Sequence, residues 1–232
     1  MIEDPPLLTI APRPEHPPVG ALDPFREAPT GWLVDAMAGR GAMDAAIKPM
    51  APEVPAMRRF VGLALTCWCG PNDNLALMAA VALAEPGDVI VAASESFTGS
   101  AMAGDLTLGM ARNRGAIAIV TDGMVRDRDG ILAVGLPVFC RGITPNSCVR
   151  SGPGTVGLPI TAGGVPVATG DLVLGDADGV VVVPRSLLGA VGDRLAAVRV
   201  AEQAAEAKVR DGAKTLPEIT ELLNSSRVRW IA

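Results

Sequence analysis

The sequence predicts an α/β protein with a partly parallel central sheet, a β-rich layer and C-terminal helices. Two observations lead to this class. Between residues 60 and 120, short apolar segments rich in β-branched residues alternate with helix-forming segments, which is typical of βαβ units. Between residues 151 and 183, glycines alternate with short valine-rich runs, which indicates strands joined by tight turns.

Each element has its own local signal. A first helix over residues 30–38 ends at Gly39 and Gly41. The centre is then expected to alternate in this order: a strand over 60–69, a helix from Asn72 or Asp73 to Ala84, a strand over 89–93, a helix over 105–113 and a strand over 116–120. After the β-rich segment, a long amphipathic helix is expected over 185–211, and a short one over 217–223.

The first 24 residues contain seven prolines. Such a segment favours an extended, polyproline-like conformation over a packed core. We therefore expect residues 1–24 to form an arm that wraps a neighbouring chain, and residues 25–232 to form a single domain.

Composition excludes several kinds of chemistry. The 232 residues include one histidine, His16, which lies in the arm, and no tyrosine. A Ser-His-Asp or Cys-His nucleophile would lack its imidazole base, and a zinc site with several histidines could not form within one chain. The net charge of −5 also argues against a nucleic-acid partner, because a phosphate-binding groove needs clustered basic residues.

The four cysteines show no CxxC spacing, which favours free thiols in a reducing cytoplasm. The N-terminus lacks the pattern of a signal peptide, and the longest apolar run, over residues 75–84, is too short to cross a bilayer. We therefore expect a cytoplasmic protein that does not bind membranes.

Two short motifs resemble ligand sites but lack the required context. Gly152, Gly154 and Gly157 spell G-x-G-x-x-G, yet prolines and further glycines follow where a dinucleotide-binding helix should begin, so no nucleotide cofactor is expected. The segment 176–179 resembles part of a calcium loop but lacks the other ligands, so a β-turn is the better interpretation.

The informative pattern is Gly104-Asp105, a spacing of twenty residues, and then Arg126-Asp127. The intervening helix and strand should bring both pairs to the carboxyl edge of the sheet, where open α/β sheets bind ligands. The amides of Leu106 and Thr107 would lie in the first turn of the helix, where they can bind an anion. The competing interpretation is an ordinary charged loop, because Arg128-Asp129 follows directly.

These residue types suit a 2-keto acid. The guanidinium of Arg126 and the helix amides would hold a carboxylate and its neighbouring keto oxygen. Asp127, and less directly Asp105, would hold a hydrated Mg2+ or Mn2+ ion. Such a cation polarises a 2-keto group and stabilises an enolate formed beside it.

The chain resembles the RraA-like family over about residues 30 to 215. The resemblance rests on the motifs Pro86-Gly-Asp-Val-Ile-Val, Ala103-Gly-Asp105 and Asp122-Gly-Met-Val-Arg-Asp127, and on Gly170-Asp-Leu-Val and Asp178-Gly-Val-Val-Val-Val-Pro184. That family includes the class II 4-hydroxy-4-methyl-2-oxoglutarate/4-carboxy-4-hydroxy-2-oxoadipate aldolases. It implies a swivelling-type β/β/α fold, assembled as a trimer or a dimer of trimers with sites at subunit interfaces.

The resemblance also implies residue roles. Arg126 would bind the pyruvyl group, Asp127 would be the direct metal ligand, and Asp105 would hold water on the cation. The amides of Leu106 and Thr107 would bind the substrate carboxylate beside Gly104. A glutamate of the neighbouring subunit's C-terminal helix would complete the site, with Glu202 the better match and Glu206 the alternative.

The implied reaction is retro-aldol cleavage of a 4-hydroxy-2-oxo acid to pyruvate and a second keto acid, with decarboxylation of oxaloacetate through the same enolate. The other branch of the family binds and inhibits ribonuclease E and tends to lose the acid after the arginine. Asp127 is present here, which favours the enzyme. A third possibility is a member with neither activity, and Thr107, where aldolases more often have an apolar residue, leaves the substrate open.

Overall fold

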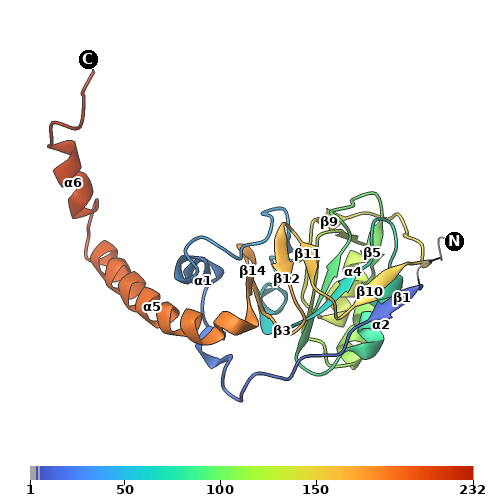
Figure 1. Ribbon diagram of the computed structural model, residues 1–232. Helices are drawn as coiled ribbons and strands as arrows, with labels where there is room; N and C mark the ends of the chain where they lie inside the picture. Colours follow the sequence, from blue (N-terminus) through green and yellow to red (C-terminus); the bar gives the residue numbers. More distant parts are fainter. Residues whose placement is uncertain (1–3, 5, 232) are drawn as a thin grey trace. The chain divides into compact units, whose positions relative to one another are not determined.

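The computed structural model describes residue 4 and residues 6–231, and within that part of the chain nine strands form one large mixed sheet. Its strands are β1 (Leu8–Ile10), β2 (Lys48–Pro49), β3 (Phe60–Trp68), β4 (Asp88–Ala93), β6 (Ala118–Thr121), β8 (Val138–Cys140), β10 (Gly154–Val156), β13 (Leu172–Asp176) and β14 (Gly179–Val183). The strand order is β1-β10-β3-β4-β6-β8-β2, and the β13–β14 hairpin joins through β13 to the first half of β3. Figure 1 labels β1, β3, β10 and β14 of this sheet.

The parallel centre of the sheet consists of β3, β4, β6 and β8. The connections between these strands contain α2 (Leu75–Leu83), α3 (Asp105–Asn113) and α4 (Arg128–Val134). Strands buried on both faces read as continuous apolar runs, as β4 does. The predicted α/β class and the partly parallel sheet are therefore confirmed, while the swivelling-type β/β/α description stays a prediction.

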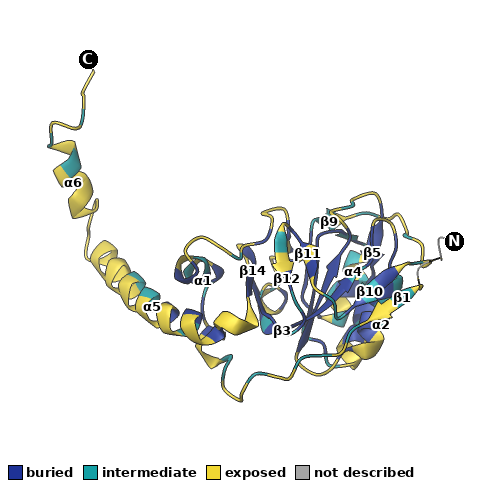
Figure 2. Ribbon diagram, viewed as in Figure 1, coloured by how far each residue is buried: buried dark blue, intermediate teal, exposed yellow. Residues whose placement is uncertain are grey.

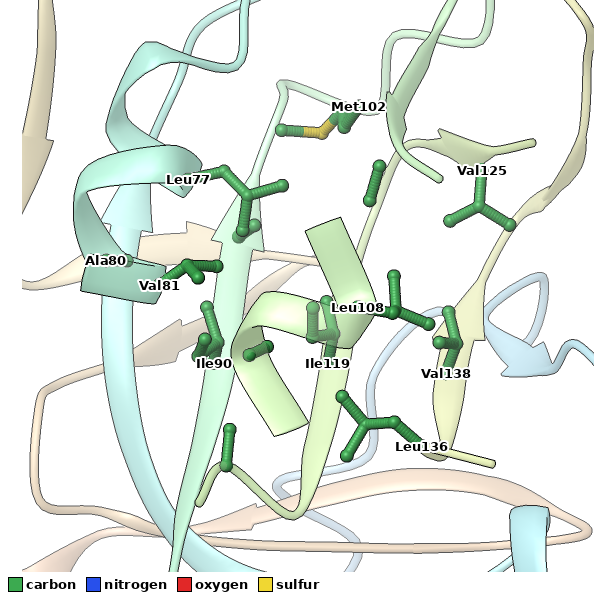
Figure 3. Packing of buried hydrophobic residues seen from close by; sticks show 14 of the residues in the cluster. Leu77, Ala80, Val81, Ile90, Met102, Leu108, Ile119, Val125, Leu136 and Val138 are labelled. Carbon is green, nitrogen blue, oxygen red and sulfur yellow. The ribbon is translucent and has the colours of Figure 1, made fainter. Parts of the chain in front are cut away.

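Two hydrophobic clusters lie on the two faces of the sheet. On one face, residues such as Ile90 and Ile119 pack with Leu77 and Leu108 of the helices (Figure 3). On the other face, the alternating residues Val89, Val91 and Val120 pack with the hairpin of β11 (Ile160–Ala162) and β12 (Val165–Val167) and with β13 and β14. The period-two alternation of strand side chains thus separates a helical layer from the predicted β-rich layer.

A small parallel sheet extends the central strands beyond their carboxyl ends. It contains β5 (Ala101–Ala103), β7 (Met124–Val125) and β9 (Gly142–Ile143), which follow β4, β6 and β8 in the chain. The sequence did not predict β5, because residues 94–104 are mostly small or polar, with glycines at 99 and 104, and show no strand pattern. This second sheet carries the candidate site.

Part of the N-terminal arm contacts the chain to which it belongs, and the expectation that it wraps a neighbouring chain stays a prediction. Leu8–Ile10 pairs in parallel with β10 of the same chain, and Phe25 is fully buried. Arg13 forms two hydrogen bonds with the buried Asp88, at 3.0 and 2.7 Å. Residues 1–3 and 5 of the predicted arm lie outside the described residues, and the boundary at residue 24 stays a prediction.

The remaining helices are α1 (Thr30–Ala36), α5 (Leu188–Arg210), which follows a 3-10 turn at Arg185–Leu187, and α6 (Pro217–Leu223). Leu188, Val191 and Leu195 of α5 are buried in the first compact unit, which ends at Leu195. The second unit, Ala196–Ala232, contains the rest of α5 and α6, and α6 has no buried residue (Figure 2). Among the described residues, no helix is both long and apolar enough to span a bilayer.

The two motifs that resemble ligand sites in the sequence, at residues 152–157 and 176–179, are parts of strands and turns. Gly154 begins strand β10 and no helix starts on the G-x-G-x-x-G segment, so this stretch lacks the geometry of a dinucleotide turn. Asp176 and Gly179 are paired residues at the turn between β13 and β14, as the sequence predicts. The carboxylate of Asp176 accepts hydrogen bonds from the amide and hydroxyl of Thr30, both at 2.8 Å, and thereby attaches α1 to this hairpin.

Candidate active site

Asp105 is the first residue of α3, and Gly104 before it is extended. The carboxylate of Asp105 accepts a hydrogen bond from the amide of Leu106 at 2.7 Å. A ligand carboxylate would therefore compete with Asp105 for that amide. The hydroxyl of Thr107 lies 3.8 Å from the sulfur of Met78 in α2, so its side chain packs between the two helices, whereas Leu106 is exposed.

Arg126 and Asp127 lie between β7 and α4. The amide of Arg126 donates to the carbonyl of Ala103 at 3.0 Å, which places the end of β7 beside the end of β5. Asp127 has a left-handed backbone, with φ 61° and ψ 48°, a conformation that few non-glycine residues adopt. Its carboxylate lies 3.3 Å from Nε of Arg126, and both side chains are 43% exposed. Both groups are thus accessible to a ligand.

Two glycines allow the acids to approach the backbone closely. A Cβ atom at Gly104 would lie 2.3 Å from Oδ2 of Asp127, and one at Gly130 would lie 2.4 Å from Oδ2 of Asp105. Both distances are shorter than any real contact, so each acid occupies space that only a glycine leaves free. The starts of α3 and α4 are therefore packed against each other through carboxylates rather than apolar side chains.

These residues surround one cavity of about 390 Å3. It is lined by all the candidate site residues of the segments 104–107 and 126–127: Gly104, Asp105, Leu106, Thr107, Arg126 and Asp127. The sequence analysis expects Gly104-Asp105 and Arg126-Asp127 to meet at the carboxyl edge of the sheet. They meet there because β5 and β7, the strands that precede them, are neighbours. The size is within the range of about 300 to 1,000 Å3 typical of small-molecule sites.

The opposite wall of the cavity was not predicted. It includes Asn74, Ser147, Cys148 and Arg150. A guanidinium nitrogen of Arg126 donates to the hydroxyl of Ser147, while Nε of Arg150 donates to Oδ1 of Asn74 at 3.1 Å. No local motif marks these residues, because they enter the site through contacts between segments far apart in the sequence.

Cys148 is the free thiol of this wall. Partial burial raises its pKa, and the negative charge of Asp73 adds to this effect, so the thiol stays protonated at neutral pH. A protonated thiol is a weak nucleophile. We therefore assign the chemistry of the cavity to its arginines and carboxylates.

A metal ion would find oxygen ligands here but not a complete set. Among the described residues, no cluster of three or more histidine, cysteine or acidic side chains could hold a metal. Glu202 and Glu206 lie in the second compact unit of the chain, Ala196–Ala232. Two carboxylates, one directly beside an arginine, fit a hard divalent cation that keeps several water ligands, as Mg2+ usually does.

Fold and cavity together define a class: an α/β protein with a cavity, at the carboxyl edge of parallel strands, that is lined by guanidinium groups and carboxylates. The comparisons with known proteins then identify the family. A family profile described as RraA-like, Aldolase/RraA, matches residues 30–182. The chain belongs to the RraA-like family.

Individual relatives cover most of the chain. A curated protein of Halalkalibacterium halodurans, provisionally named 4-hydroxy-4-methyl-2-oxoglutarate aldolase, is 41% identical over 161 residues, which make up 69% of this chain and 75% of the relative. An uncharacterized protein from Pseudomonas syringae pv. tomato has a similar solved structure, with a TM-score of 0.72, 26% identity and coverage of 86% of this chain and 96% of that one. RraAS2 of Streptomyces coelicolor, described as an unusual member of the RNase ES inhibitor RraA family, has a TM-score of 0.70, 26% identity and coverage of 84% and 98%.

Proposed function

We propose that the protein is a cytoplasmic, divalent-metal-dependent aldolase. It cleaves a 4-hydroxy-2-oxo acid of the 4-hydroxy-4-methyl-2-oxoglutarate type to pyruvate and a second keto acid, and it also decarboxylates oxaloacetate. The observation that carries this proposal is the position of Arg126, Asp127 and Asp105 around one cavity. The provisional name of the Halalkalibacterium halodurans relative supports it.

Arg126 is the residue that binds the pyruvyl part of the substrate. Its guanidinium is accessible, and Ser147 and Asp127 limit its orientations. A planar fork of donors suits a carboxylate and a neighbouring keto oxygen better than a point charge does. As C3–C4 cleavage moves negative charge onto the keto oxygen, the same donors stabilise the product enolate.

Asp127 would hold the cation directly, and Asp105 would hold it through water. When bound, Mg2+ or Mn2+ would polarise the 2-keto group and stabilise negative charge on its oxygen. In the cleavage step the 4-hydroxyl gives its proton to a water molecule, its oxygen becomes the carbonyl of the departing keto acid, and the C3–C4 electron pair forms the enolate. Protonation at C3 then produces pyruvate, and Asp105 would orient the water molecule that carries the proton.

We further propose that the active protein is a trimer or a dimer of trimers in which each site includes an acid of a neighbouring subunit. Two carboxylates in one chain leave the metal environment short of protein ligands. Glu202 is the candidate for the third acid, with Glu206 as the alternative.

The direct test measures pyruvate with coupled lactate dehydrogenase. Oxaloacetate and 4-hydroxy-4-methyl-2-oxoglutarate are each supplied with Mg2+ and then with EDTA. Metal-dependent pyruvate release from either substrate, lost in Asp127→Ala, is the expected result. Absence of metal-dependent release from both substrates, or full activity of Asp127→Ala, would reject the enzyme.

The second candidate function is a regulator that binds ribonuclease E. The similarity to the Streptomyces coelicolor protein, described as a member of an RNase ES inhibitor family, favours it. Binding of purified ribonuclease E, together with inhibition of its cleavage activity and no pyruvate release, would support this function instead.

A further inference from the structure

The small sheet β5-β7-β9 is joined to the central sheet by three short connections that lie next to one another. Strand β4 leads to β5 through residues 94–100, β6 leads to β7 through residues 122–123, and β8 leads to β9 through residue 141. Arg126 and Asp127 directly follow β7. The position of these two side chains therefore depends on how the three connections are held together.

Asp122 links two of these connections. The residue is 2% exposed, and its Oδ1 accepts hydrogen bonds from the amide and the hydroxyl of Ser94, at 2.7 and 2.9 Å. Its Oδ2 accepts a hydrogen bond from the amide of Ser96 at 3.1 Å. Hydrogen bonds to a carboxylate are stronger than those between neutral groups. One buried carboxylate thus joins the end of β6 to the end of β4.

The turn that Asp122 contacts has an unfavourable backbone. The amide of Phe97 donates to the carbonyl of Ser94 at 3.1 Å, and the two residues between them, Glu95 and Ser96, have φ angles of 57° and 58°. Two central residues with positive φ are typical of a type I′ turn, which favours asparagine and glycine. Glu95 and Ser96 are neither, so the turn depends on contacts from outside it, and Asp122 supplies them on both sides of Glu95.

Arg141 connects the third segment to the other two. Its amide donates to the carbonyl of Gly123 at 2.9 Å, and its guanidinium donates to the hydroxyl of Ser96 at 3.2 Å. The connections are also closely packed, because a Cβ atom at Gly123 would lie 2.7 Å from Oγ of Ser94. All three connections therefore belong to one hydrogen-bonded network, with the buried Asp122 inside it.

This network reaches the candidate site through β7. Asp122 precedes this strand and Arg126 follows it. The amide of Arg126 donates to the carbonyl of Ala103 at 3.0 Å, so a shift of β7 changes the contact between the two segments that carry the site. A misplacement of about 1 Å in an active site can lower a rate by about 100-fold.

From these contacts we propose that Asp122 is a positioning residue for Arg126 and Asp127. By holding the turn at residues 94–97, it fixes the small sheet relative to the central sheet. Asp122 is not one of the described residues that line the cavity, so it acts through them. The kinetic consequences rest on the proposed aldolase function, whereas the effect on the small sheet can be measured without turnover.

Asp122→Asn is the main variant, because it keeps the size of the side chain and replaces one acceptor oxygen with an NH2 group. In either orientation that group would face a backbone amide, which is also a donor. The matched control is Asp171→Asn. Asp171 is 5% exposed and accepts the amides of Ala168 and Arg185, each at 2.8 Å, but it belongs to neither the three connections nor the described lining of the cavity.

Amide hydrogen exchange tests the effect on the small sheet directly. In Asp122→Asn the amides of residues 101–103 and 124–126 should exchange at least about tenfold faster, because charge-assisted hydrogen bonds at the junction are lost. The amides of β4 and β6 should change by less than about threefold. In Asp171→Asn, the small sheet should change no more than the central sheet. Equal acceleration of both sheets in Asp122→Asn, or no acceleration of the small sheet, would overturn the proposal.

Kinetics test the effect on the site. Asp122→Asn should lower kcat for pyruvate release by roughly 10- to 100-fold and change KM less, while Asp171→Asn should change kcat by less than about threefold. Adding Ser96→Gly to Asp122→Asn should restore part of kcat, because glycine adopts positive φ without cost and the turn then needs less support. A role for Asp122 that did not involve the turn predicts no recovery.

The two measurements separate this proposal from the aldolase reaction. Selective acceleration of exchange in the small sheet supports the positioning role even if the wild type releases no pyruvate, and in that case only the aldolase is rejected. If the wild type is active and Asp122→Asn keeps its kcat, or if the double variant shows no recovery, the positioning role is rejected and the aldolase stands.

Discussion

At the scale of single residues, the candidate site depends on a missing methyl group at Gly104. Its φ of −139° is accessible to any residue, so alanine would introduce no backbone strain there. The added Cβ would nevertheless lie 2.3 Å from Oδ2 of Asp127 and 3.2 Å from Cγ of Arg126. We predict that Gly104→Ala displaces Asp127 and lowers metal-dependent pyruvate formation at least about tenfold, a loss of roughly 1.4 kcal/mol in the transition state.

Gly109→Ala is the matched control. It lies in the same helix, and its added Cβ would meet nothing closer than Val134 at 3.9 Å. Alanine should stabilise the helix by about 0.5–1 kcal/mol and leave activity unchanged. Steady-state kinetics and thermal unfolding of both variants test this pair, and equal activities in the two would contradict the role of Gly104.

Cys140 allows a prediction about pH. Burial raises the pKa of its thiol to about 11, from 9.0 in an exposed thiol. Between these values the unfolded chain loses the proton while the folded protein keeps it, so the free energy of unfolding falls as pH rises from 9 to 11. Between pH 9 and 11 this thiol should lower the free energy of unfolding by on the order of 2 kcal/mol, since one pKa unit corresponds to about 1.4 kcal/mol.

Urea unfolding at several pH values between 8 and 11 measures this effect. Cys140→Ala creates a small cavity whose cost does not depend on pH, so the variant should lose less stability than the wild type over the same interval. Parallel pH profiles for the two proteins would show that the thiol does not contribute.

At the scale of elements, local sequence signals located most of the helices and strands. The predicted range 105–113 coincides with α3 and 217–223 with α6, because Asp105 and Pro217 begin these helices in typical ways. The sequence analysis assigns no helix to residues 128–134, and its competing interpretation places a charged loop at Arg128-Asp129, yet these residues form α4. The left-handed Asp127 that precedes α4 depends on its surroundings, which no local pattern encodes.

The same distinction applies to the candidate site. The Arg126-Asp127 wall follows a strand and could be predicted from spacing and sheet topology. Arg150 and Asn74 could not, because the hydrogen bond between them joins residues 76 positions apart. This contact forms only because hydrogen bonds of Asp73 and Val149 join the segment around Asn74 to the segment around Arg150. It is therefore a result of tertiary packing.

The attachment of β1 to the sheet leads to a prediction for the N-terminal arm. Arg13 donates to both carboxylate oxygens of Asp88, whose side chain is 3% exposed, while the side chain of Arg13 is 23% exposed. Removing one partner of a buried pair typically costs about 3–5 kcal/mol. We expect about 2 kcal/mol for Arg13→Ala, because water can reach this arginine and the amide of Glu85 still donates to Asp88.

Denaturant unfolding measures that loss against Arg26→Ala. Arg26 and its partner Asp23 are 63% and 65% exposed, so their ion pair should contribute less than about 1 kcal/mol. If both variants lost the same small amount of stability, the arm would be attached by its strand pairing alone.

At the scale of the whole molecule, the single chain provides the proposed substrate-binding cavity but only part of the proposed metal site. Asp105 and Asp127 line the cavity, and no third metal-binding side chain joins them among the described residues. Leu106, which lines the same cavity, is 78% exposed. A second subunit that covers this rim and contributes an acid would account for both features.

Subunit mixing can test this arrangement. Asp127→Ala and Glu202→Gln should each abolish most activity, because each removes one acid from every site. If the two acids of a site come from different subunits, each acid is present in a random hybrid with a chance of about one half. Both acids are then present in about one quarter of the sites. When equal amounts of Asp127→Ala and Glu202→Gln are unfolded and refolded together, the mixture should recover about 25% of wild-type activity. Each variant refolded alone should stay inactive.

Glu206→Gln mixed with Asp127→Ala distinguishes the two glutamates. If Glu206 is a surface acid of α5, Glu206→Gln is active by itself. Mixing it with Asp127→Ala then gives no more activity than the Glu206→Gln subunits alone provide. If Glu206 is the shared ligand, the pair containing Glu206→Gln shows the recovery and Glu202→Gln is active alone. Failure of both mixtures to recover activity, with sedimentation showing mixed oligomers, would place all metal ligands of a site within one chain.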